Sequence, residues 1–250
     1  MKLLRFDRNG TPTWGCVKGD MVFAMAGEPY EGIRYDGTSV PLASCRLLAP
    51  CQPTKLVCIG KNYYDHAVEM NEGIPEHPIL FLKAPNTVNT HEGTVHAPDF
   101  VKRLDYEGEL GVVIKRVAKD VKPEDFADYI LGYTCLNDIT ARDIQKGDGQ
   151  WSRGKSMDGF APFGPWITDE VDPGDLLLET RLNGKTVQSS RTSSLMTGVA
   201  ELLAYITASM TLMPGDIIAT GTPAGIGPMQ PGDTVEVEIE GIGVLRNFII

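Results

Sequence analysis

The sequence has few of the residues that form disulfides or bind soft metal ions. Its five cysteines are an odd number in a chain of 250 residues, and no two of them have the CxxC spacing. A disulfide framework or a zinc site is therefore not expected, and the pattern is typical of a protein from a reducing compartment. We expect the protein to be cytoplasmic.

The chain also has fewer basic residues than acidic residues. The chain has 23 Lys and Arg residues against 33 Asp and Glu residues, which gives a formal net charge of −10. A surface this acidic repels phosphate backbones, so nucleic acid is not an expected partner. Small anionic substrates are not excluded, because a local cation can reverse the field inside one cleft.

The chain lacks a long apolar run. Charged residues interrupt residues 1–10, so no signal peptide is expected. The most apolar later stretch, residues 202–221, contains Pro214 and Asp216 and is not expected to cross a membrane. The glycine-rich segment GTPAGIG at residues 221–227 matches neither a P-loop nor a dinucleotide fingerprint.

What the sequence does contain is a series of short strand patterns separated by turn residues. Residues 1–50 carry several such patterns, which predict a small β-rich unit. Pro50 and Pro53 then indicate a linker. We therefore predict an N-terminal domain of residues 1–52 and a larger catalytic domain of residues 53–250.

Periodicity predicts the main secondary structure. In residues 234–239 Val and Ile alternate with Glu, which indicates a strand with one buried face. In residues 195–210 apolar residues recur at helical spacing after a Thr-Ser-Ser cap region, which predicts the one clear helix. A shorter helix is predicted between Asn62, a candidate N-cap, and Gly73. The predicted fold is thus mostly β with a few helices (α+β).

The strongest chemical signal is the segment LDYEGELGVVI. Glu107 and Glu109 are two residues apart, so on a strand their side chains leave the same face. Two like charges on a half-buried face are costly unless a cation lies between them. Asp138 ends another apolar run and adds a third carboxylate, and an all-oxygen set suits Mg²⁺ or Mn²⁺. The alternative is a solvated edge strand whose glutamates face water.

Cationic and polar residues occur in the motifs around these acids. Arg is suited to binding a carboxylate through two hydrogen bonds, and Lys can neutralise an enolate as a point charge. Each of these residues has an alternative role as a surface charge or a turn residue. The candidates are Lys83 in ILFLKAPN, Arg142 and Gln145 in NDITARDIQ, Lys155 in the glycine- and proline-rich loop SRGKSMDGFAPFGPW, and Thr222 in IIATGTPAGIG.

His66 and Glu69 form a further candidate pair. At i and i+3 on a helix they share a face and can form a hydrogen bond. A carboxylate that holds a histidine raises its basicity, which suits a general base. The segment lies between Gly60 and Gly73 and can move as a lid, so we expect it to be poorly ordered or displaced when no substrate is bound, with His66 away from the metal. The alternative is an ordinary solvated helix pair.

Together these segments resemble the fumarylacetoacetate hydrolase superfamily. The motifs keep the family's order over residues 54–250, and six in sequence are highly specific. The short form with a lid-like helix is more similar to acylpyruvases, oxaloacetate decarboxylases and dienoate isomerases than to the longer animal tyrosine-pathway enzyme. The matching segments are IGKNYYDHAVEM, ILFLKAPN, LDYEGELGVVI, GYTCLNDITARDIQ, SRGKSMDGFAPFGPW and IIATGTPAGIG.

The resemblance implies a core of mixed β-sandwich roll type, a small N-terminal β-rich domain and a homodimer. It implies that Glu107, Glu109 and Asp138 hold one divalent cation per subunit, Mg²⁺ or Mn²⁺. It also implies catalytic roles for His66, Glu69 and Lys155, and substrate contacts for Lys83, Arg142, Gln145 and Thr222.

One motif departs from the family pattern. The chain has KSMDGFAPFGP where relatives often carry KGFDTFCP. Lys155 is kept, so the expected binding of metal and acid is unaffected. Met157 and Gly159 are expected to alter what the pocket admits beyond the carboxylate end of the substrate.

The reaction that the resemblance implies passes through a metal-held enolate, whose charge the cation offsets. We predict hydrolysis or decarboxylation of a small 2-oxo acid, such as a 3-acylpyruvate, a fumarylacetoacetate-like acid or oxaloacetate. The second prediction is isomerisation of an acid of the 2-hydroxyhepta-2,4-diene-1,7-dioate type. A non-catalytic binding protein of the same fold and an inert scaffold are the remaining alternatives. The His66–Glu69 pair argues against a binding protein, because a protein that only binds need not keep a base.

Overall fold

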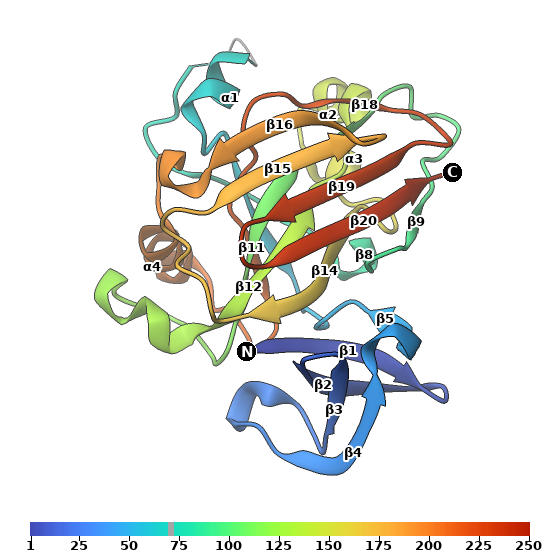
Figure 1. Ribbon diagram of the computed structural model, residues 1–250. Coiled ribbons are helices and arrows are strands. Elements are labelled where there is room, and N and C mark those ends of the chain that lie inside the picture. Colours follow the sequence, from blue (N-terminus) through green and yellow to red (C-terminus); the bar gives the residue numbers. More distant parts are fainter. Residues whose placement is uncertain (70–72) are drawn as a thin grey trace.

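Short strands are the main secondary structure and hold more residues than the helices do (Figure 1). The computed structural model describes residues 1–69 and 73–250. As predicted, the chain is mostly β with a few helices. Its strands form three sheets, and the strands that carry the candidate acids lie in the middle of the largest one.

The largest sheet has twelve strands. They are β1 (Lys2–Arg8), β2 (Thr11–Lys18), β3 (Met21–Met25), β4 (Tyr35–Pro41), β5 (Leu47–Leu48), β6 (Leu56–Gly60), β7 (Ile79–Lys83), β8 (Val88–Asn89), β11 (Gly108–Ile114), β12 (Ile130–Asn137), β14 (Ala161–Thr168) and β17 (Ile217–Ala219). The main order is β4-β3-β2-β1-β14-β12-β11-β17-β6-β7, while β5 pairs with β1 and β8 pairs with β14.

Two smaller sheets complete the β-structure. The five-stranded sheet has the order β16-β15-β19-β20-β9, and the three-stranded sheet has the order β13-β10-β18. Their strands are β9 (Thr94–Val95), β10 (Leu104–Tyr106), β13 (Thr140–Ala141), β15 (Leu177–Leu182), β16 (Lys185–Arg191), β18 (Gly227–Met229), β19 (Thr234–Ile239) and β20 (Gly243–Ile249). In β19 every second residue is buried, which confirms the alternation expected from its sequence.

The helices are short. The α-helices are α1 (Tyr64–Glu69), α2 (Arg142–Asp148), α3 (Ser152–Lys155) and α4 (Val199–Ser209), and the 3₁₀ turns are η1 (Pro29–Glu31), η2 (Leu42–Ser44), η3 (Pro85–Thr87), η4 (Pro123–Tyr129) and η5 (Thr192–Ser194). Within the described part of the chain no helix has the length and apolar character needed to cross a membrane.

Both predicted helices form, but their limits differ from the expected ones. The helix expected over residues 195–210 begins only at Val199, because Gly198 has an extended backbone with φ −73° and ψ 170°. The helix expected between residues 62 and 73 is observed as α1, and residues 70–72 lie outside the described part of the chain. Asn62 binds the backbone of Thr197 and Thr220 through its side chain, and so ties the end of β6 to two distant segments.

The N-terminal strands extend the large sheet. Asn9 and Gly10, with φ of 53° and 84°, form the turn between β1 and β2. Strand β1 pairs with β14, where Lys2 faces Thr168 and Leu3 faces Ile167. In Figure 1 these strands lie at the opposite end of the molecule from α1 and α2. The domain limits at residues 52 and 53 stay a prediction.

The main core lies between α4, the middle of the large sheet and the five-stranded sheet. Helix α4 buries Leu202, Leu203 and Ile206 completely, and these side chains join Leu110 and Ile114 of β11 in one cluster. Strand β11 also begins beside the candidate acids. The packing of the main core therefore holds in place the strand on which these acids lie.

We predict that Leu110→Ala lowers the free energy of unfolding by about 3 kcal/mol, because it removes buried methyl groups and leaves a cavity. Urea denaturation followed by circular dichroism measures this loss. Leu177→Ala in β15 is the matched control, since the Leu177 side chain is 36% exposed and the same change there should cost less than about 1 kcal/mol. Equal losses in the two variants would contradict the assignment of Leu110 to the core.

Candidate active site and metal centre

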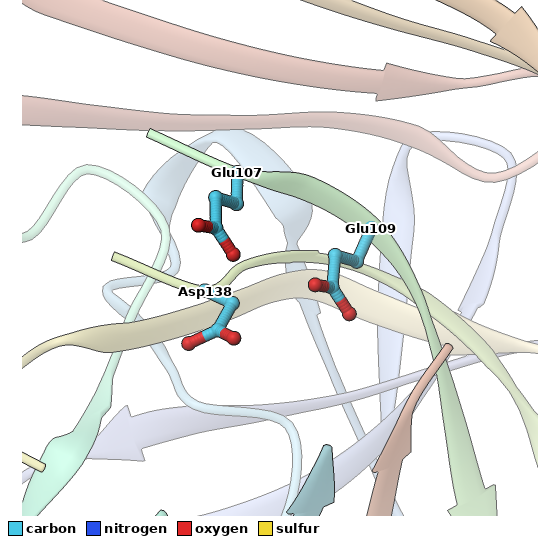
Figure 2. Close-up of side chains that lie close together, drawn as sticks. All are labelled: Glu107, Glu109 and Asp138. Carbon is cyan, nitrogen blue, oxygen red and sulfur yellow. The ribbon is translucent and has the colours of Figure 1, made fainter. Parts of the chain in front are cut away.

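Three buried carboxylates meet beside the paired strands β11 and β12 (Figure 2). Glu107 immediately precedes β11 and Asp138 immediately follows β12, and the backbone N–H of Asp138 donates to the carbonyl of Glu107 at 2.8 Å. The third acid is Glu109, and one carboxylate oxygen from each acid lies within 4.8 Å of the others. None of the three side chains faces bulk solvent, which excludes the alternative of a solvated edge strand.

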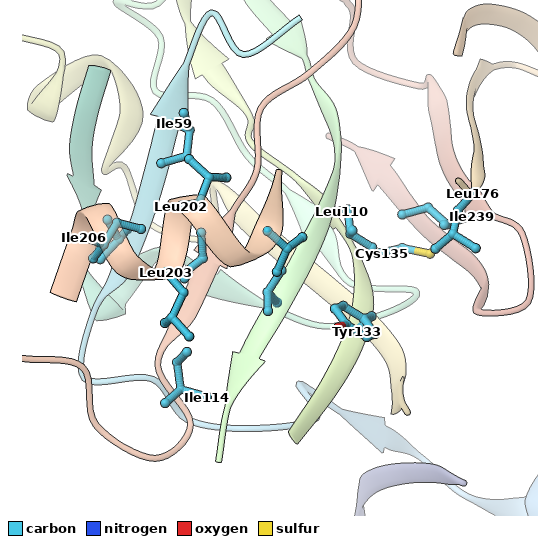
Figure 3. Packing of buried hydrophobic residues seen from close by; sticks show 14 of the residues in the cluster. Ile59, Leu110, Ile114, Tyr133, Cys135, Leu176, Leu202, Leu203, Ile206 and Ile239 are labelled. Carbon is cyan, nitrogen blue, oxygen red and sulfur yellow. The ribbon is translucent and has the colours of Figure 1, made fainter. Parts of the chain in front are cut away.

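The strand geometry explains why these acids converge. Glu107 and Glu109 are two residues apart in extended backbone, so both point to the same side, as their spacing predicts. Leu110 points to the opposite side, where it lies beside Cys135 in the core cluster that also contains the buried side chains of α4 (Figure 3). The core contact therefore sets which face of β11 carries the acids.

Lysine side chains neutralise two of the acids. Lys155 Nζ lies 2.6 Å from Glu107 Oε2 and 2.7 Å from Asp138 Oδ2, and Lys83 Nζ lies 2.5 Å from Asp138 Oδ1. Burial alone would lower the pKa of Lys155, but Asp138 and Glu107 raise it above its usual value. Lys155 is the last residue of α3 and not part of a loop as expected, because its N–H bonds to Trp151 O.

Arg142 joins the same network from the start of α2. It donates to Glu107 Oε1, to Asp105 Oδ2 at 2.8 Å and to Gln145 Oε1 at 2.6 Å. Burial alone would lower the pKa of Arg142, but Glu107 and Asp105 raise it. Glu107 thus binds two cationic side chains, and together they hold its pKa well below the usual range despite its burial.

Glu109 differs from the other two acids. Within residues 1–69 and 73–250 it forms no ion pair, and its Oε2 accepts a hydrogen bond from Gly221 N at 2.8 Å. Burial and the neighbouring charges of Asp138 and Glu107 raise its pKa well above the usual value. A cation beside Glu109 would remove this penalty, and three carboxylates form an oxygen set of the kind that binds Mg²⁺ or Mn²⁺. The donor set therefore fits a divalent metal ion.

A cavity of about 240 Å³ opens onto this cluster. Of the ten site residues predicted from the sequence, seven line it: His66, Glu107, Glu109, Arg142, Gln145, Lys155 and Thr222. The other three lie close by but do not line the cavity. Asp138 and Lys83 are fully buried behind it, and Glu69 lies behind His66. Lys83 also donates to Ile139 O at 2.9 Å, so the structure places it against Asp138 and away from the space for a substrate.

Helix α1 brings His66 to this cavity. His66 is 6% exposed, and its Nδ1 lies 3.2 Å from Glu69 Oε2. The other carboxylate oxygen of Glu69 accepts a hydrogen bond from Gly225 N at 3.0 Å. This bond holds α1 against the glycine-rich turn after β17, so α1, the described helical part of the segment, is not displaced from the site as expected.

Two positioning residues were not predicted. Gln188 of β16 donates from Nε2 to Thr222 Oγ1 and Pro223 O, both at 2.8 Å, and its Oε1 accepts from Gly108 N at 3.0 Å. It is one buried residue in a largely exposed strand, so no sequence pattern marks it. Asp105, which binds Arg142, lies two residues before Glu107, and this same-face spacing was the available signal.

Aromatic side chains form the apolar wall of the cavity. The rings of Phe81 and Trp151 meet edge to face with centroids 5.2 Å apart. A Cβ atom added to Gly60 would lie 2.7 Å from a ring carbon of Trp151. Only glycine at residue 60 therefore lets the indole pack this closely.

Both parts of the chain match family models. Residues 55–250 match the model described as fumarylacetoacetate (FAA) hydrolase C-terminal. Residues 1–50 match the model described as Rv2993c-like, N-terminal. The first match covers all ten predicted site residues, so the motifs of the site and the family model point to the same region.

Known relatives cover most of the chain. It is 44% identical over 223 residues to the oxaloacetate tautomerase YisK of Bacillus subtilis, which covers 84% of this chain and 76% of the relative. It is 37% identical over 223 residues to a mitochondrial oxaloacetate tautomerase of Rattus norvegicus, and the match covers 84% of this chain and 71% of the relative. The crystal structure of 2-hydroxyhepta-2,4-diene-1,7-dioate isomerase from Mycobacterium marinum superposes with a TM-score of 0.94 at 42% identity, with coverage of 100% and 98%.

We predict that Gln188→Leu lowers the free energy of unfolding by about 1–3 kcal/mol, because the buried N–H of Gly108 and the carbonyl of Pro223 lose their partner. Urea denaturation measures the loss. Gln150→Leu, at an exposed position, is the control and should change stability by less than about 0.5 kcal/mol. If Gln188→Leu behaved like this control, the proposed support of the site by β16 would be wrong.

Proposed function

Because the chain belongs to the fumarylacetoacetate hydrolase family, we propose that it moves a proton at C3 of a small 2-oxo dicarboxylic acid and so interconverts its keto and enol forms. One observation carries this proposal: His66, paired with Glu69, lines the same cavity as Glu107, Glu109 and Lys155. The two oxaloacetate tautomerases among the relatives support the choice of reaction.

We propose that Glu107, Glu109 and Asp138 hold one Mg²⁺ or Mn²⁺ ion per subunit. The three acids offer only oxygen atoms, and Glu109 is buried without a charged partner in the described part of the chain. When bound, such an ion would polarise the 2-oxo group of the substrate and offset the negative charge that develops on it. In this proposal the proton transfer and the binding of the substrate are carried out by side chains of the protein.

In this proposal His66 is the base. A carboxylate only accepts hydrogen bonds, so the imidazole donates from Nδ1 to Glu69 and leaves Nε2 free to take a proton. Glu69 stabilises the imidazolium that results, and its bond to Gly225 keeps the pair oriented. His66 then returns the proton to the other end of the enol system, which completes the tautomerisation without consuming water.

Lys155 and Arg142 provide positive charge to the substrate in this proposal. Lys155 Nζ uses two of its three hydrogens on Glu107 and Asp138, and the third is available to an oxyanion in the cavity. Arg142 and Gln145 line the cavity beside it and can bind a carboxylate. The substrate contact of Thr222 stays a prediction; its hydroxyl hydrogen goes to Gly108 O in this structure.

The other predicted reactions share the enol and stay predictions. Hydrolysis of a 3-acylpyruvate would add a water activated by His66, and decarboxylation would release CO₂ from the distal end. Isomerisation of a dienoate needs the same proton transfer over a longer conjugated system, and the isomerase from Mycobacterium marinum supports it as the second candidate. The homodimer also stays a prediction, which light scattering can test.

We expect His66→Ala to lower kcat/KM for the conversion of enol-oxaloacetate to its keto form by about 10²–10⁴-fold, because the general base is lost. The reaction is followed by the absorbance of the enol with Mg²⁺ or Mn²⁺ present. Hydrolysis of acetylpyruvate and release of CO₂ from oxaloacetate are measured in parallel, and the reaction with the highest kcat/KM identifies the activity.

The control for this prediction is His77→Ala, which removes an exposed histidine and should leave all rates unchanged. Wild-type kcat/KM in His66→Ala would show that His66 is not the base. If the wild-type protein did not accelerate the tautomerisation in the presence of Mg²⁺ or of Mn²⁺, the proposed function would be wrong.

The metal proposal makes a separate prediction for Glu109→Gln. Affinity for Mn²⁺ should fall at least tenfold by calorimetry, because a charged ligand is lost. In the absence of metal the melting temperature should stay the same or rise, because the variant no longer buries an uncompensated carboxylate. Glu170→Gln, where the side chain is 69% exposed, is the control. Unchanged Mn²⁺ affinity in Glu109→Gln would contradict the assignment of this acid as a ligand.

A further inference from the structure

Helix α2 directs three side chains toward the cavity. Arg142, Gln145 and Lys146 stand at i, i+3 and i+4, so they share one helical face, and all three line the cavity. Arg142 and Gln145 are 4% and 7% exposed, whereas Lys146 is exposed. The face therefore runs from the buried acids at its inner end to Lys146 at the mouth.

The inner cations are already engaged by the acids of the site. Lys155 binds Glu107 and Asp138, and Arg142 binds Glu107 and Asp105. Lys146, by contrast, forms no ion pair with any residue in the ranges 1–69 and 73–250. In a chain of net charge −10, a ligand with two negative charges gains from a cation placed at the entrance.

The walls of the cavity limit where a second carboxylate can bind. On one side Phe81, Trp151 and Gly60 present an apolar surface, which offers no partner for a charged group. Among the described residues, the charged side chains that line the mouth are Lys146 and Lys61, and Lys61 follows the last residue of β6. A small diacid whose 2-oxo end faces Glu107 and Glu109 must place its other carboxylate away from the aromatic wall.

We propose that Lys146 binds the distal carboxylate of a 2-oxo dicarboxylic acid and so makes the site selective for diacids over monoacids. This inference rests on the proposed function, because it takes the 2-oxo end to lie at the buried acids. Lys146 is a specificity-determining residue in this scheme and takes no part in the proton transfer. Its loss weakens binding of the diacid and leaves the rate of the bound complex unchanged.

A matched pair of ligands isolates the distal carboxylate. Oxaloacetate and 2-oxobutanoate differ only at C4, which is a carboxylate in the first and a methyl group in the second. Malate and 2-hydroxybutanoate differ in the same way and have no 2-oxo group to tautomerise, so their binding can be measured by calorimetry without turnover. All measurements use the full chain in the presence of Mg²⁺. The wild-type protein is compared with the variants Lys146→Met, Lys61→Met and Lys122→Met. Lys122 is an exposed lysine outside the cavity and serves as the control.

We expect Lys146→Met to raise KM for oxaloacetate about tenfold with kcat within about twofold of wild type, because a charge-assisted contact made equally in ground and transition states is lost. The inhibition constant of 2-oxobutanoate should not change. In calorimetry the preference for malate over 2-hydroxybutanoate should fall by the same factor. Lys122→Met, which makes the same change in net charge, should keep the wild-type preference.

The results separate this inference from the proposed function. A wild-type preference for diacids in Lys146→Met, or its loss in Lys61→Met alone, overturns the role of Lys146. If the wild-type protein prefers malate through Lys146 but does not turn over oxaloacetate, the subsite stands and the proposed reaction falls. If it turns over oxaloacetate but shows no preference between malate and 2-hydroxybutanoate, the reaction stands and the subsite is wrong.

Discussion

The buried carboxylate of Glu107 is the group around which the site is organised. It accepts hydrogen bonds from Arg142 and Lys155, which come from two different helices, and its own backbone carbonyl accepts from Asp138. Removing one member of such a buried network would leave another charge unpaired, at a cost of several kcal/mol. The positions of α2, α3 and the end of β12 are therefore linked through a single residue, by its side chain and its backbone carbonyl.

Much of this arrangement could be predicted from the sequence because strand spacing is strict. Glu107 and Glu109 had to share a face once β11 was recognised, and the apolar residues after them predicted a buried strand. Helix α2, which places Arg142 and Gln145 on one face, was not predicted; the sequence identified these two residues only as site candidates. The family motifs added the order of the segments, and the mostly-β fold was confirmed.

What could not be predicted depends on contacts between segments far apart in the chain. Lys83 and Lys155 are both buried lysines, yet only Lys155 reaches the cavity, because β7 places Lys83 behind Asp138. Gln188 contacts Gly108 only after β16 has packed across β11. Local spacing carries no information about such pairs, since each partner taken alone is an ordinary polar residue.

The order of the strands in the large sheet has a consequence for how the protein is made. Residue 2 pairs with residue 168 and residue 56 with residue 217, and in the five-stranded sheet residue 94 pairs with residue 248. A ribosome delivers the N-terminal strands first, so β1 can pair early with β2 and β6 with β7, but their other partners, β14 and β17, are synthesised more than a hundred residues later. Folding is therefore expected to be slow and largely post-translational, and the nascent chain carries open strand edges that chaperones are suited to cover.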